Sequence, residues 1–266
     1  MKGIFDVSIS VFVRAIAGGA LGTAMLVAAS GAAHAQDGAE QPAPKPETPA
    51  LTTSATVGFA TDYRFRGISL NNGRETIQGS ITAAHKSGFY VTAWGSAFSA
   101  VEGDSSEIAL YGGYQRNIGG VGVNVGVVAY LFPEDSNLSF LEIYGSASKK
   151  FGPVTQTLGA YFAPKQDSDG VRRSSGETGS SAYYYSTTTL AVPKLPVTLG
   201  ATIGYEKGAR VLSQGGKVDW DLSETLRQFG LDWSIHYIGS DAPRVISFTG
   251  NNITREAVVA SISKTF

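Results

Sequence analysis

Ionisable residues recur at every second position in several stretches of this sequence. In one of them, an extended strand would place the charges of Asp62, Arg64 and Arg66 on a single face. The rings of Tyr63 and Phe65 would then lie on the opposite face. A charged face that opposes an aromatic face needs water on one side and an apolar medium on the other. This pattern is typical of a membrane β-barrel with a wet interior.

The same alternation places ten ionisable side chains opposite the apolar faces of their strands. We expect them to line a barrel lumen, where rings of charged side chains select solutes. Six are acids and three are arginines, which predicts a weak preference for cations. The ten are Asp62, Arg64, Arg66, Glu107, Glu142, Asp219, Asp221, Arg227, Asp232 and His236.

One of these strands raises the question of catalysis, because Asp232, Ser234 and His236 share a face. Side chains two residues apart on a strand project in parallel about 7 Å apart, too far for a nucleophile to bond its base directly. We therefore predict no catalytic residue. A barrel enzyme such as an acyl hydrolase remains an alternative.

Metal and cofactor chemistry finds little support in the sequence. It contains no cysteine, and His85 and His236 are scattered and make no zinc set. Residues 167–170 resemble the start of a calcium loop, but the bidentate glutamate of such a loop is missing. We predict no metal and no cofactor.

Strands must position these side chains, and the turn residues divide the chain into about twelve of them. Short connections alternate with longer polar ones, and intervals of about ten residues suit tilted membrane strands. We therefore predict an all-β fold, a transmembrane antiparallel up-and-down β-barrel. Short connections are expected at residues 86–88, 117–120, 151–153, 193–196 and 228–230, and longer ones at 70–73, 100–104, 133–137, 164–180, 206–215 and 241–253.

The first residues have the pattern of an export signal. A basic leader precedes an uncharged Ala/Gly-rich stretch that ends in Ala-His-Ala, which predicts cleavage between Ala35 and Gln36. We expect residues 1–35 to be the signal peptide, 36–52 a Pro/Ala-rich periplasmic linker and 53–266 the barrel. An even number of strands then puts both ends in the periplasm and the longer loops outside.

The last strand ends on Phe266, with Val258, Ala260 and Ile262 on the same face. A terminal aromatic residue behind alternating apolar residues looks like the signal that the barrel assembly machinery recognises, although Lys264 departs from the pattern. We expect a monomer in the cell outer membrane, in contact with lipid and with small hydrophilic solutes. The formal net charge of −1 argues against a nucleic-acid partner.

The chain resembles the TorF family of outer-membrane porins over nearly all of its mature length. The resemblance implies a β-barrel and a porin, but it supplies no substrate and no functional residues. Thr61, where serine is usual, and the long insertion at 164–180 depart from the pattern. The matching blocks are residues 61–69 (TDYRFRGIS), 78–79, 88–90, 94–96, 110–114 (LYGGY), 130–133 (YLFP), 141–145 (LEIYG), 231–233 and the C-terminal strand.

We therefore expect a porin-like barrel that allows passive diffusion of small hydrophilic solutes. The main alternative is a plugged structural or adhesive barrel without transport, and a soluble β-sandwich is a further one. Eight strands leave an interior that side chains fill, whereas sixteen leave a water-filled channel, so twelve strands are compatible with either state. Ten ionisable groups in a dry lumen would have to be paired.

Overall fold

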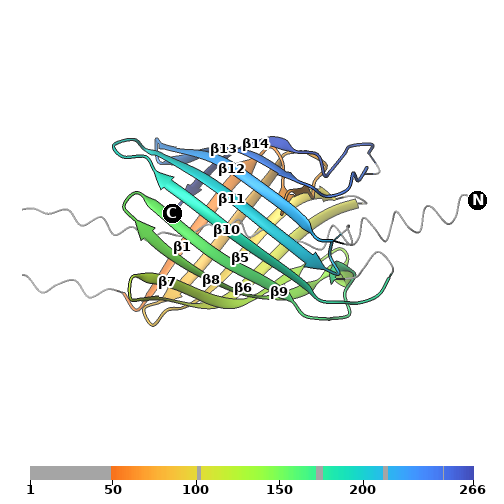
Figure 1. The fold of residues 1–266 in the computed structure, drawn as a ribbon, viewed down its shortest axis with the longest axis horizontal. Helices are drawn as coiled ribbons and strands as arrows, with labels where there is room; N and C mark the ends of the chain where they lie inside the picture. Colours follow the sequence, from red (N-terminus) through yellow and green to blue (C-terminus); the bar gives the residue numbers. More distant parts are fainter. Residues whose placement is uncertain (1–48, 101–102, 172–175, 212–214, 248) are drawn as a thin grey trace, which may run out of the picture.

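The computed structural model of the protein is a closed barrel of twelve antiparallel strands that run obliquely around a common axis (Figure 1). It describes residues 49–266 except 101–102, 172–175, 212–214 and 248. The barrel strands are β1 (Leu51–Ala60), β4 (Thr76–His85), β5 (Phe89–Ala100), β6 (Gly103–Ile118), β7 (Val121–Leu131), β8 (Phe140–Phe151), β9 (Val154–Ala163), β10 (Ser181–Ala191), β11 (Val197–Gly208), β12 (Lys217–Gln228), β13 (Leu231–Ser240) and β14 (Ala257–Thr265).

Each barrel strand pairs with its neighbours in the chain, and β1 closes the cylinder by pairing with both β4 and β14. Closure leaves the barrel without an edge strand, as a spanning sheet requires in lipid. The predicted up-and-down barrel of about twelve strands is confirmed. No helix in the described part of the chain is long and apolar enough to span a membrane. The shorter elements are β2 (Arg64–Phe65), β3 (Ile68–Ser69), and the 3-10 turns η1 (Ser136–Leu138) and η2 (Asp169–Val171).

Apolar side chains cover the outside of the barrel. Val125 and Val127 on β7 are 48% and 45% exposed, and Trp233 and Ile235 on β13 are 45% and 60% exposed. A belt of this kind contacts lipid chains in a membrane barrel, whereas it would be unfavourable in water. The predicted apolar-out, polar-in alternation of these strands is therefore confirmed.

The two ends of the barrel differ in the length of their connections, and we call them the turn end and the loop end. At the turn end, Gly119 and Gly120 join β6 to β7 with φ angles of 59° and 79°, which only glycine adopts freely. The prediction of a long loop at residues 100–104 is wrong, because β5 runs to Ala100 and β6 already begins at Gly103. The longer connections of the loop end are residues 61–75, 132–139, 164–180, 209–216 and 241–256.

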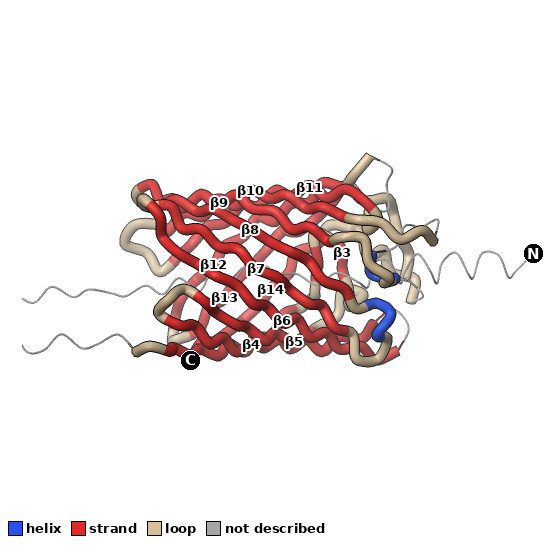
Figure 2. The backbone as a smooth tube through the Cα atoms, turned by 90° about the horizontal axis from the view of Figure 1, so that it is seen from below, coloured by secondary structure: helices blue, strands red, loops and turns tan. Residues whose placement is uncertain are grey.

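Residues 61–75, which we call the lumen hairpin, do not form the spanning strand that the sequence predicts. β1 ends at Ala60, and the chain turns into the barrel, where β2 pairs with β3 at the loop end (Figure 2). Residues 62–72 are all buried. The expectation that Tyr63 and Phe65 face lipid is therefore wrong, since these rings are 2% and 5% exposed inside the barrel.

The lumen hairpin brings apolar side chains into the barrel. Phe65 and Leu70 belong to one buried cluster with Tyr130 and Phe140 of the barrel wall and with Ile253 of the last long loop. The ring centroids of Tyr130 and Phe140 lie 4.7 Å apart. Burial of this apolar surface stabilises the inward position of the hairpin.

The same packing explains why β5 has aromatic residues on both of its faces. Phe89 is 63% exposed on the lipid side. Trp94 points inward, and its ring centroid lies 5.6 Å from that of Tyr63 in the lumen hairpin. The inward Trp94 of β5 therefore packs against the lumen hairpin.

The chain ends at the turn end of the barrel. The backbone N–H of Phe266 donates a 2.8 Å hydrogen bond to the carbonyl of Ala55. Its ring is 70% exposed and shares the outer face with Val258, which is 68% exposed. The predicted leader, the cleavage site at Ala35 and Gln36, and most of the predicted linker lie outside the described residues.

Several glycines that face inward lie beneath tyrosine rings. A Cβ atom at Gly159 would fall on the ring of Tyr185, and one at Gly204 would fall on the ring of Tyr183. The missing side chains let rings from neighbouring strands lie against the backbone of the wall.

The Gly159→Ala substitution should therefore lower the free energy of unfolding by about 1–3 kcal/mol, because the new methyl group collides with the Tyr185 ring. Gly112→Ala is the matched control, since nothing lies within 4 Å of a Cβ atom there. Urea unfolding in lipid vesicles, followed by tryptophan fluorescence, measures both. Equal stability of the two variants would contradict the packing described here.

Candidate functional site

The lumen hairpin reverses direction in two residues. Phe65 pairs with Ile68, and the intervening Arg66 and Gly67 have φ angles of 46° and 86°. Two positive φ angles in succession are the pattern of the tight turn that suits the twist of a hairpin. Arg66 adopts this conformation although it is not glycine, so its surroundings must compensate for the strain.

Local hydrogen bonds hold the two sides of the hairpin together. Arg64 Nε lies 2.6 Å from Asp62 Oδ2, and Asp62 Oδ1 accepts a 2.7 Å hydrogen bond from the hydroxyl of Ser69. The hydroxyl oxygen of Ser69 in turn accepts from the backbone N–H of Gly73 at 2.8 Å. The Arg64 guanidinium also donates to the carbonyl of Arg255, just before β14, at 2.6 Å.

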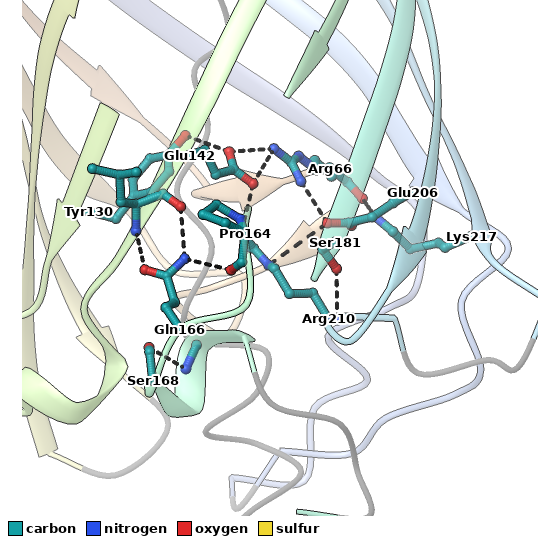
Figure 3. Close-up of polar contacts among 12 residues, drawn as sticks. Arg66, Tyr130, Glu142, Pro164, Gln166, Ser168, Ser181, Glu206, Arg210 and Lys217 are labelled. Atoms are coloured by element: carbon teal, nitrogen blue, oxygen red, sulfur yellow. Dashed lines mark hydrogen bonds and ion pairs between the residues drawn. The ribbon is translucent and has the colours of Figure 1, made fainter. Parts of the chain in front are cut away.

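Arg66 connects the hairpin to two strands of the barrel wall (Figure 3). Its Nη2 lies 2.8 Å from Glu142 Oε2 on β8, and its Nη1 lies 2.6 Å from Glu206 Oε1 on β11. The guanidinium carbon also lies 4.1 Å from the centre of the Tyr183 ring. Two carboxylates and an aromatic face therefore surround one cation at the tip of the hairpin.

Two further cations extend this cluster. Arg210 Nη1 lies 3.1 Å from Glu142 Oε1, and Lys217 Nζ lies 3.5 Å from carboxylate oxygens of both Glu206 and Asp219. The Lys217 ammonium also donates to the carbonyl of Arg66. The full cluster, which we call the anchor cluster, balances three cations against three anions: Arg66, Arg210, Lys217, Glu142, Glu206 and Asp219.

Burial makes each pair in the anchor cluster depend on the others. The side chains of Arg66, Glu142 and Glu206 are 3%, 1% and 4% exposed. Burial alone would lower the pKa of Arg66, but the two carboxylates raise it above its ordinary value. Removal of one partner from such a buried pair typically costs about 3–5 kcal/mol, because an uncompensated charge remains.

Several predicted lumen residues lie apart from the anchor cluster. Glu107 is buried on β6 and accepts a 3.2 Å hydrogen bond from the hydroxyl of Tyr63. Asp221 Oδ1 lies 3.0 Å from His236 Nδ1 on the neighbouring strand. Arg227 and Asp232 form a two-bond ion pair, 2.7 and 2.8 Å, beside the last short turn, where the Arg227 side chain is 71% exposed.

The structure thus brings Arg66, Glu142 and Asp219 into one cluster and distributes the other predicted residues through the lumen. Sequence reasoning missed Glu206, Arg210 and Lys217. Glu206 shares its inward parity with other residues of β11, and Lys217 shares that of Asp219, so strand alternation could have indicated both. Arg210 lies in a loop and had no such indication.

The side chains once considered for catalysis have separate partners. The hydroxyl of Ser234 bonds to that of Thr225 at 2.8 Å, Asp232 pairs with Arg227, and His236 pairs with Asp221. Among the described residues, no group of three or more His, Cys, Asp or Glu side chains is arranged to hold a metal ion.

Cysteine labelling tests the inward position of the hairpin, because the sequence has no cysteine of its own. Leu70→Cys should react slowly with a membrane-impermeant maleimide, since Leu70 is 2% exposed. Glu75→Cys, at an exposed position of the same hairpin, is the matched control and should react at once. Adding Arg66→Ala should accelerate labelling of the Leu70→Cys protein. If Leu70→Cys and Glu75→Cys reacted at equal rates while Arg66 is intact, the hairpin would not be buried.

Comparison with solved structures relates this architecture to outer-membrane porins. The KdgM porin has a TM-score of 0.54 at 9% identity, over 80% of this chain and 99% of the porin. The NanC porin has a TM-score of 0.54 at 9% identity, over 80% and 98%. Outer membrane phospholipase A from Escherichia coli has a TM-score of 0.46 at 8% identity, over 80% and 95%. At these identities the likeness to the two porins shows the fold alone.

A search of curated proteins gives no match. One family matches residues 44–266, which include every described strand, and its description is "Bacterial protein of unknown function (Gcw_chp)". The chain therefore belongs to the Gcw_chp family of bacterial proteins.

Proposed function

We propose that the protein is an outer-membrane channel for small hydrophilic solutes and that the lumen hairpin closes its loop end. The observation that carries this proposal is the hairpin itself, which is buried inside the barrel and tied to the wall by charges. A hairpin that served only to fill the barrel permanently would need no ion pairs at its tip, because apolar packing would hold it. Reversible ion pairs suit a segment that moves.

The other half of the lumen supports a path for solutes. The hydroxyls of Thr187 and Thr202 bond to each other at 2.9 Å, and those of Thr225 and Ser234 at 2.8 Å. These four side chains face inward and yet are partly exposed. Inward residues that remain exposed indicate water-filled space, which we call the turn-end vestibule.

Membrane barrels carry short turns on the periplasmic side and longer loops outside. The vestibule then opens to the periplasm, and the lumen hairpin closes the barrel towards the exterior. The resemblance to the TorF family of porins agrees with a channel. The terminal Phe266 would serve the barrel assembly machinery, and the closed sheet suits a monomer surrounded by lipid.

The weak cation preference expected from the sequence now depends on fewer residues. Asp219 is neutralised by Lys217 and bonded to the hydroxyl of Tyr183 at 3.0 Å. Asp221 lies nearer the turn end than Asp219 on the same strand. Its partner His236 is charged only when protonated. We propose that Asp221 supplies most of the cation preference of the open channel, and that no chemical step accompanies transport.

A plugged barrel without transport is the second candidate, because the anchor cluster is charge-balanced and fully buried. The two candidates differ in what happens when the hairpin is released. A channel conducts once the hairpin is gone, whereas a structural barrel whose remaining lumen is filled does not.

Arg66→Ala should therefore raise the fraction of time that purified protein conducts in a planar bilayer, because the hairpin loses both carboxylate partners. Arg227→Ala is the control, since it removes an exposed arginine from the turn end. Replacing residues 62–74 by a short Gly-Ser linker should give a continuously open pore. If that deletion variant inserts as a folded barrel and stays silent at every voltage, the plugged barrel is correct.

In the deletion variant, Asp221→Asn should shift the reversal potential in a salt gradient towards anions, because a negative charge leaves the path. Glu224→Gln removes the same charge from the exposed outer face of the same strand, β12, and should cause no shift. Equal shifts for both variants would show that surface charge, and not Asp221, determines the preference.

A further inference from the structure

A row of tyrosines climbs the inner wall of the barrel. Direct strand pairing aligns Tyr90 on β5 with Gly113 and Gly126, and then with Tyr144 on β8. The same row continues to Tyr161 on β9 and Tyr183 on β10. Because barrel strands are tilted, a line of directly paired residues rises around the wall, here from the turn end towards the loop end.

Successive rings of this row lie close together. The ring centroids of Tyr144 and Tyr161 are 5.5 Å apart, and those of Tyr161 and Tyr183 are 6.5 Å apart. Tyr185, one step nearer the turn end on β10, lies 6.1 Å from Tyr161. We call Tyr90, Tyr144, Tyr161, Tyr183 and Tyr185 the tyrosine track.

The rings of the track lie against the barrel wall because glycines make room for them. Tyr144 lies over Gly126, Tyr185 over Gly159 and Tyr183 over Gly204. Tyr90, Tyr161 and Tyr185 remain partly exposed, so a solute in the vestibule can reach them.

Neutral polar groups accompany the aromatic surface. The hydroxyl of Tyr90 donates a 2.9 Å hydrogen bond to Asn124 Oδ1. Thr187, on the same face of β10 as Tyr185, adds a hydroxyl group nearer the turn end. Asn124 and Thr187, the polar neighbours of the track named here, carry no charge. This disfavours an ionic ligand at the end of the track nearer the turn end.

We propose that the tyrosine track binds neutral sugars, as a site within the channel proposed above. A sugar ring has an apolar face of C–H groups, which packs on the negative face of an aromatic ring, and an edge of hydroxyls for amides and alcohols. Aromatic faces beside neutral hydrogen-bonding groups match both properties. A track of several rings suits an oligosaccharide that moves from one ring to the next.

The upper end of the track meets the lumen hairpin. The Arg66 guanidinium lies 4.1 Å from the ring centre of Tyr183 and 5.5 Å from that of Tyr161. A sugar that reaches these rings competes with Arg66 for the same aromatic faces. Its binding therefore favours the conformation in which the hairpin has left the lumen.

Calorimetric titration of the purified full-length protein in detergent tests this site without relying on conductance. The probes are glucose, galactose, maltotriose and cellotriose, with polyethylene glycol of similar mass as a flexible, ring-free control. At least one sugar should bind, and the polymer should not. Absence of binding by all four sugars, to the full chain and to the deletion variant alike, overturns the proposal.

Tyr185→Leu should raise the Kd of the bound sugar roughly two- to twelvefold, since an aromatic contact contributes about 0.5–1.5 kcal/mol beyond its area. Tyr185→Phe should retain affinity, because the ring remains. Tyr184→Leu is the matched control, as the neighbouring tyrosine of β10 is 48% exposed on the lipid face. Equal losses for Tyr185→Leu and Tyr184→Leu overturn the assignment to the track.

Current recordings separate this proposal from the channel itself. Sugar binding by a protein that never conducts would refute the channel and leave the binding site. Conductance through a pore that binds no sugar would support the channel and refute the tyrosine track. Sugar-dependent interruption of the current that disappears in Tyr185→Leu would support both.

Discussion

The guanidinium of Arg66 lies between carboxylates from two strands, Glu142 on β8 and Glu206 on β11, and much of the interior depends on this contact. If only the Arg66 guanidinium were lost while the hairpin stayed in place, both carboxylates would remain buried with less positive charge near them. If the carboxylates were absent, the tip would carry a buried, unpaired cation. The hairpin and the wall therefore neutralise each other's buried charges. This mutual dependence stabilises the conformation in which the hairpin lies inside the lumen.

The barrel could be predicted from the sequence because lipid imposes a simple rule on it. Val125 and Val127 alternate with small or polar residues, as do Trp233 and Ile235, and that alternation continues through strands of membrane-spanning length. An error of one position would reverse the faces of a whole strand, so the pattern is reliable where lipid lies on one side. The strand number followed from the turns between such stretches.

The hairpin could not be predicted in this way because the barrel interior contains apolar surface of its own. Tyr63 and Phe65 alternate with charges just as lipid-facing residues do, yet they pack on Trp94 and Tyr130 inside. Alternation distinguishes two faces of a strand without naming the medium on either side. Arg210 was missed for a related reason, since its role depends on a loop folding inward, and loops lack the periodicity on which the prediction rests.

The position of the hairpin also has a mechanical consequence. Through Arg64 and Arg66 it holds the barrel at three separate points of its circumference, on β8, on β11 and at Arg255 before β14. A thin cylinder flattens readily under sideways pressure unless something braces it across its width, and the hairpin acts as a strut of this kind at one rim. Lateral pressure from the bilayer should therefore deform the unbraced rim first, which is the end that holds the vestibule.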